Sequence, residues 1–163
     1  MQARKFTAFV AATLASAALP TIVLMALVGT IASDEITRDE WWIVAGLLFA
    51  IALAHVVLLG VPAVVLLRRI GRYRLLPMSI AGALVGALPY AIFSFPFNVA
   101  AGVDVFNDGV QAMANGVATS AGWLEGVQEA AVFGALGFVG ALAFYGVHRA
   151  IAEPTKGAIG ALR

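Results

Sequence analysis

Four long stretches of the chain contain apolar residues almost without interruption. They cover residues 6–32, 41–67, 75–97 and 123–148. A helix needs about 20 apolar residues to cross a hydrocarbon core of about 30 Å. None of the four stretches shows the apolar–polar alternation of a membrane barrel strand. The pattern therefore predicts an all-α integral membrane protein built as a bundle of four transmembrane helices.

The first stretch also has features of a secretory signal peptide. Two basic residues precede it, and Ala15-Ser16-Ala17 resembles a small-residue cleavage site. The apolar run continues to Ile31, however, whereas the apolar core of a signal peptide has only about 7–15 residues. We therefore expect an uncleaved first helix.

The charged residues between the stretches alternate in sign along the chain. Nine of the ten lysines and arginines lie in the N-terminal tail, in segment 68–74 or after residue 148, whereas segments 33–40 and 98–122 are acidic. Lys and Arg favour the cytoplasmic side of a membrane. Both termini are therefore predicted to be cytoplasmic, in a bacterial-type inner membrane. Trp41, Trp42 and Trp123 then fall at the outer interface, where tryptophan is enriched.

The outer connection between the third and fourth stretches, residues 98–122, is too long for a plain turn. Its apolar residues recur at the three-and-four spacing of one helical face; they are Val103, Phe106, Val110, Met113 and Val117. This spacing predicts a short amphipathic helix. Because the segment has no basic residue to attract anionic lipid, we expect the helix to dock onto this protein or onto a partner.

Composition agrees with the membrane assignment and excludes several functions. Hydrophobic residues make up 62% of the 163 residues, against roughly 45–50% in soluble domains. A net charge of +1 offers no basic field for nucleic acid. The chain has no cysteine, which excludes disulfides, Cys-ligated zinc and iron–sulfur clusters. We expect one transmembrane domain, residues 1–152, followed by a short cytoplasmic tail, residues 153–163.

His55 is the main candidate for a functional side chain. It lies halfway along stretch 41–67, near the bilayer midplane, where an ionisable residue is costly. It is either a functional group or a neutral imidazole that hydrogen-bonds a neighbouring helix. Tyr90 is the predicted partner of His55, with Ser16 as the reserve. The other histidine, His148, lies too far toward the cytoplasmic end for both to ligate one haem.

Glu129 is the second candidate, because it lies about one turn deeper in the fourth stretch than Glu125. The two carboxylates, four residues apart, share one helix face, and Glu129 is the better group for a protonatable outer vestibule. A carboxylate pair without a nearby histidine is a weak signal for a metal, and no metal or other cofactor is predicted.

Proline interrupts three of the stretches, at Pro20, Pro62 and Pro89. Each proline removes a backbone donor and frees the carbonyl four residues earlier. These carbonyls belong to Ser16, Leu58 and Val85. The resulting kinks shape a cavity or a hinge, or are only structural.

Small residues form the predicted packing interface. Gly82 and Gly86 make a GxxxG motif in the third stretch, and Gly134, Gly137 and Gly140 follow one another in the fourth. Lipid gives no hydrophobic drive for helix association, so small faces that allow close approach must hold the helices together. Whether these glycines meet within one chain or across two chains stays open.

The leading hypothesis for function is a non-enzymatic one. The sequence has no GxSxG, HExxH or Walker A motif. We expect an accessory, regulatory or immunity-like protein that acts through helix–helix and outer-loop contacts. Its partners would be the lipid bilayer and a membrane protein or further copies of itself, without nucleic acid. The alternative is a proton-coupled small transporter or channel subunit that uses His55 and Glu129.

Overall fold

The computed structural model describes residues 2–31, 37–93, 102–107 and 109–152, and it is mostly helical. Its helices are α1 (Gln2–Ile31), α2 (Arg38–His55), the π-helical turn η1 (Val56–Gly60), α3 (Val61–Arg69), α4 (Leu75–Phe93) and α5 (Ser120–Ala152). Within these ranges, four helical segments are long and apolar enough to cross a membrane, which confirms the four predicted spans in length and composition. Predicted helix ends at residues 32 and 94–97, loop residues 98–101 and the tail at 153–163 lie outside the described residues.

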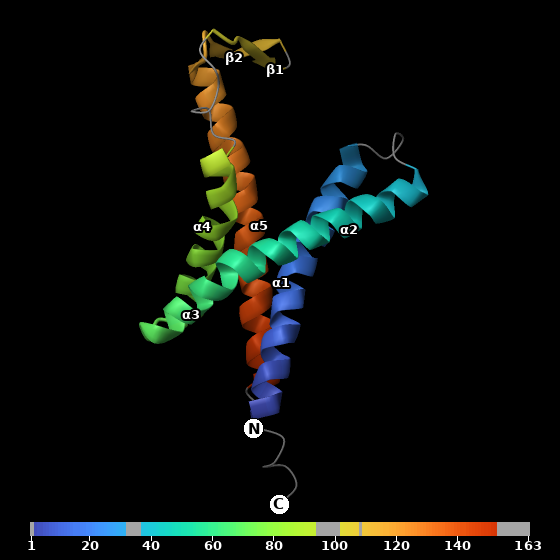
Figure 1. Ribbon diagram of the computed structural model, residues 1–163, viewed down its shortest axis with the longest axis vertical. Helices are drawn as coiled ribbons and strands as arrows, with labels where there is room; N and C mark the ends of the chain where they lie inside the picture. The colour runs from blue at the N-terminus through green and yellow to red at the C-terminus, as the bar shows by residue number, and fades with distance from the viewer. Residues whose placement is uncertain (1, 32–36, 94–101, 108, 153–163) are drawn as a thin grey trace, which may run out of the picture.

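Helix α5 is the centre of the arrangement and packs against both α1 and α4. The α2–η1–α3 segment crosses these three helices obliquely (Figure 1). This segment is 31 residues long, from Asp39 to Arg69, or about 46 Å at 1.5 Å per residue. A helix longer than the hydrocarbon core is accommodated by tilting, and the oblique crossing accords with that length.

The π-helical turn η1 sits directly before Pro62. Its wide geometry is marked by a backbone hydrogen bond from the Val61 N–H to the Val56 carbonyl, five residues back. Pro62 has no N–H to offer the carbonyl of Leu58, so the regular α-helical ladder is interrupted at this point. π-turns occur often at functional sites, and this one begins at the residue after His55.

The α4–α5 contact is a close approach of two backbones at glycine. A Cβ atom added to Gly82 would lie 2.6 Å from the Gly137 carbonyl oxygen, and one added to Gly137 would lie 2.8 Å from the Gly86 Cα. Neither position has room for a side chain. The glycine stripe of the sequence therefore meets a second stripe within the same chain.

The other two glycines of the predicted interface also face neighbours within the chain. A Cβ on Gly140 would lie 2.8 Å from the Ser16 carbonyl oxygen of α1, and one on Gly134 would lie 3.4 Å from the Ala83 carbonyl oxygen of α4. The Ser16 carbonyl is the one that Pro20 frees. The oxygen of this carbonyl lies close against the Gly140 backbone.

Three helix ends meet at one end of the molecule. Arg4 Nε donates to the Ile151 carbonyl at 2.8 Å, joining the start of α1 to the end of α5. Arg68, at the end of α3, hydrogen-bonds His148 Nε2 at 2.8 Å, and its guanidinium lies 4.6 Å from the centre of the Tyr73 ring. His148 therefore belongs to a cluster at a helix end, distant in sequence from His55.

The predicted amphipathic helix in the connection before α5 is wrong, because this segment folds as an antiparallel sheet. Its strands are β1 (Val105–Asn107), β2 (Val110–Ala114) and β3 (Val117–Ala118), in the order β1-β2-β3. Asn115 and Gly116 both have positive φ angles, 51° and 79°. An Asn-Gly pair with this geometry makes the tight turn that joins two strands, and Gly109, at φ 78°, follows β1 in the same way.

The sheet is fastened to the start of α5 (Figure 1). The Thr119 hydroxyl donates to the Gln111 carbonyl at 2.7 Å and also accepts from the Gly122 N–H at 3.2 Å. The second hydrogen bond makes Thr119 a helix cap. Asn107 Nδ2 adds a bond of 2.6 Å to Glu125 Oε1. The Asn107 side chain of β1 and the linking Thr119, which bonds the backbone of β2, therefore hold the sheet against α5.

Candidate intramembrane site

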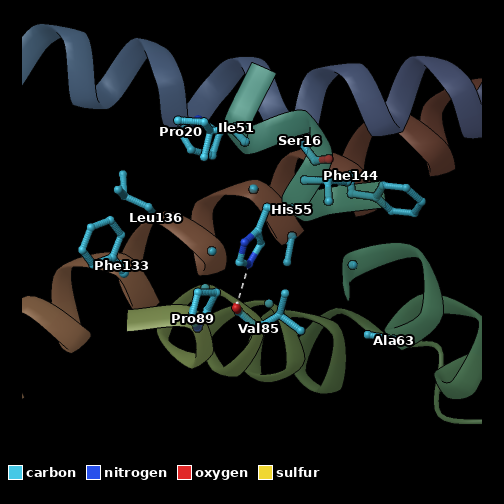
Figure 2. A pocket seen from close by; sticks show the side chains of 18 of the residues that line it. Ser16, Pro20, Ile51, His55, Ala63, Val85, Pro89, Phe133, Leu136 and Phe144 are labelled. Carbon is cyan, nitrogen blue, oxygen red and sulfur yellow. Dashed lines mark hydrogen bonds between the residues drawn. The ribbon is translucent and has the colours of Figure 1, made fainter. Parts of the chain in front are cut away.

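His55 makes the central polar contact of the bundle. Its Nε2 lies 2.8 Å from the carbonyl oxygen of Val85, and this contact joins α2 to α4 (Figure 2). Val85 lies four residues before Pro89, which has no N–H to fill that carbonyl within the helix. The histidine therefore supplies the donor that the proline removes. A carbonyl only accepts, so Nε2 carries the hydrogen, and Nδ1 of the neutral ring is an acceptor.

Tyr90 has a different partner from the predicted one. Its ring stacks on Phe133 with centroids 5.6 Å apart, and its side chain hydrogen-bonds Glu129. Ser16, the reserve candidate, donates to the Thr13 carbonyl at 2.8 Å within α1. His55 thus pairs with a backbone carbonyl and with neither predicted hydroxyl.

A cavity of about 420 Å³ surrounds His55 and is lined by α1, α2, η1, α3, α4 and α5. Ser16 and Tyr90 also line it, so three of the four residues of the predicted polar site meet at one space. The fourth, Glu129, is exposed on α5 and joins the group through Tyr90.

Apart from Thr21, the rest of the cavity wall is apolar and includes both small and large residues. Pro20, Ile51, Phe133, Leu136 and Phe144 are among the labelled side chains around His55 in Figure 2. Glycines of the α4–α5 and α1–α5 contacts also reach the wall. The glycines at which the helices pack together therefore also form part of the cavity beside His55.

The carbonyl of Val85 is the functional group that residue-type reasoning does not find, because valine has no polar side chain. Its signal in the sequence is Pro89, which frees that carbonyl. Which side chain meets the Val85 carbonyl depends on where α2 crosses α4. Glu125 likewise has a partner outside the predicted site, Asn107 of β1.

No protein-family model, curated protein or solved structure significantly matches the chain. The class defined by the helices is a membrane protein with four candidate spans. Its function is therefore inferred from its own residues.

Proposed function

We propose that the protein is a small non-enzymatic component of a bacterial-type inner membrane, with an accessory, regulatory or immunity-like role. It acts by contact with another membrane protein or with further copies of itself. The glycines of α4 and α5 pack against each other within the chain. We therefore place the proposed contact surface on the sheet at the start of α5.

The proposed orientation has both termini in the cytoplasm and the sheet outside. Nine of the ten basic residues belong to tails or connections on the cytoplasmic side in this arrangement. Two contacts support it, because Arg4 meets the end of α5 and Arg68 meets His148, at the helix ends that carry most of the positive charge.

The observation that carries the proposal is an exposed aromatic side chain on a fastened sheet. Phe106 of β1 is 61% exposed, and its register partner is Gln111 of β2. Asn107, which follows Phe106, points to Glu125 of α5, so alternation along the strand directs Phe106 away from α5. Aromatic anchors of this kind dominate the energy of many protein interfaces. Segment 102–122 has no lysine or arginine, which disfavours anionic lipid as its target.

Photo-crosslinking in cells tests this proposal. A benzophenone amino acid is placed at position 106 or, as the control, at Leu84 of α4, which is apolar and 67% exposed. We expect a discrete protein adduct from position 106 and none from position 84. An adduct of twice the chain mass identifies a second copy as the partner. Absence of any protein adduct at position 106, with a folded chain, contradicts the proposal.

The second candidate function is proton-coupled transport or a channel role. It is favoured by Tyr90, which lines the cavity beside His55 and hydrogen-bonds Glu129 on the exposed side of α5. These groups give a polar connection between the cavity and the surroundings of α5. Transport requires proton-coupled flux in reconstituted vesicles that His55→Ala and Glu129→Gln each abolish.

A further inference from the structure

We propose that the cavity around His55 binds a neutral, hydroxyl-bearing, lipid-like molecule, such as a long-chain or isoprenoid alcohol. The hydroxyl donates to His55 Nδ1, and the aliphatic part fills the apolar remainder of the cavity. This binding site is separate from the proposed contact surface on the sheet, and it does not depend on that surface.

The size and lining of the cavity fit such a molecule. Its volume of about 420 Å³ lies within the range of about 300–1,000 Å³ that is common for ligand pockets. Ligand pockets are typically apolar with a few placed polar groups. The polar side chains of this lining are Ser16, Thr21, His55 and Tyr90. An aliphatic ligand that presents one polar atom therefore matches the wall.

The hydrogen bonds already made by the cavity-lining side chains favour a ligand that donates a hydrogen bond. Ser16 donates to Thr13, and Thr21 donates to Ala17 at 2.8 Å, each within α1. Tyr90 bonds Glu129. The Nε2 hydrogen of His55 is held by Val85, so the ring presents Nδ1 as an acceptor. A hydroxyl satisfies that acceptor, whereas an ether, an ester or a bare acyl chain does not.

The depth of His55 selects a neutral ligand. It lies near the middle of the 31-residue span from Asp39 to Arg69. This middle position corresponds to the hydrocarbon core, where a charged group is costly. A phospholipid headgroup stays at the interface and does not meet this nitrogen, whereas an uncharged alcohol can lie at such a depth.

A matched pair of probes tests the hydrogen bond directly. The full chain is labelled with ¹⁵N-histidine in lipid nanodiscs, and 1-dodecanol or dodecyl methyl ether is added. Of the two probes, only dodecanol can donate a hydrogen bond. We expect dodecanol to shift the Nδ1 resonance of His55 and the ether to leave it unchanged. His148, held by Arg68 at a helix end, is the internal reference. Shifts by both probes, or by neither, overturn the proposal.

Two alanines of α2 provide matched variants for the location of the site. Ala52 lines the cavity, whereas Ala54 is exposed and lies outside the lining. We expect Ala52→Phe to abolish the dodecanol shift and Ala54→Phe to retain it, with unchanged helical content in both. In equilibrium binding, dodecanol should bind wild type roughly two- to tenfold more tightly than the ether does. His55→Leu should remove that preference. An unaltered preference in His55→Leu, or a full shift in folded Ala52→Phe, contradicts the proposed site.

Discussion

Gly137→Ala is expected to lower the free energy of unfolding by roughly 1–3 kcal/mol, the cost typical of overpacking in a well-packed interior. The added methyl would meet the backbone of α4, with its Cβ 2.8 Å from the Gly86 Cα. Neither backbone can rotate away as a flexible side chain would, so α4 and α5 must separate. Denaturant unfolding in mixed micelles, followed by circular dichroism, measures this change.

Gly146→Ala is the matched control, because Gly146 belongs to the same helix and a Cβ there has nothing within 4 Å. Alanine is a better helix former than glycine by about 1 kcal/mol, so this variant should be as stable as wild type or slightly more stable. Equal destabilisation by the two substitutions would contradict the glycine contact between α4 and α5.

Gly122→Ala is expected to detach the sheet from α5. A Cβ at Gly122 would run into the carbonyl group of Ala112 in β2, with the carbonyl carbon 3.0 Å away. The bond from the Gly122 N–H to Thr119 would be strained by the same movement. We expect the β2 amides to lose hydrogen-exchange protection by at least tenfold, while the amides of α4 and α5 retain theirs.

Ser120→Ala is the control for the sheet, since Ser120 is exposed at the first turn of α5 and adds no atom toward β2. Its exchange pattern should match that of wild type. In Gly122→Ala, the crosslink from position 106 should also weaken if a fastened sheet is what the partner binds. Full protection of β2 in Gly122→Ala would show that the sheet does not depend on this close approach.

The helical part of the fold was predictable because its signal is additive over many residues. The apolar character of each span comes from many residues, so no single residue decides the assignment. The sheet was not predicted, because five apolar residues at three-and-four spacing also fit short strands separated by turns. The informative residues were Asn115 and Gly116, whose positive φ angles permit a hairpin turn and interrupt a helix.

The candidate site was predictable in its members but not in its pairing. The depth of His55 singled it out, and Pro89 identified the Val85 carbonyl as unpaired within its helix. Pairing the two requires the crossing point of α2 and α4, which no local pattern encodes. The same holds for Gly82 and Gly137, because a small-residue stripe indicates close packing without specifying the helix on the other side.

Solid-state NMR of a sample with ¹⁵N-histidine and carbonyl-¹³C-valine tests the central claim, that His55 is held by the carbonyl that Pro89 frees. In lipid, we predict that Nε2 of His55 carries the hydrogen and shows a direct dipolar contact to the Val85 carbonyl carbon, in accord with the 2.8 Å N···O distance. Val85→Ile keeps the carbonyl but removes the label, so the contact should vanish in that control. The account would be contradicted by a hydrogen on Nδ1. It would also be contradicted if His55 showed no valine contact, or if its valine contact persisted in Val85→Ile.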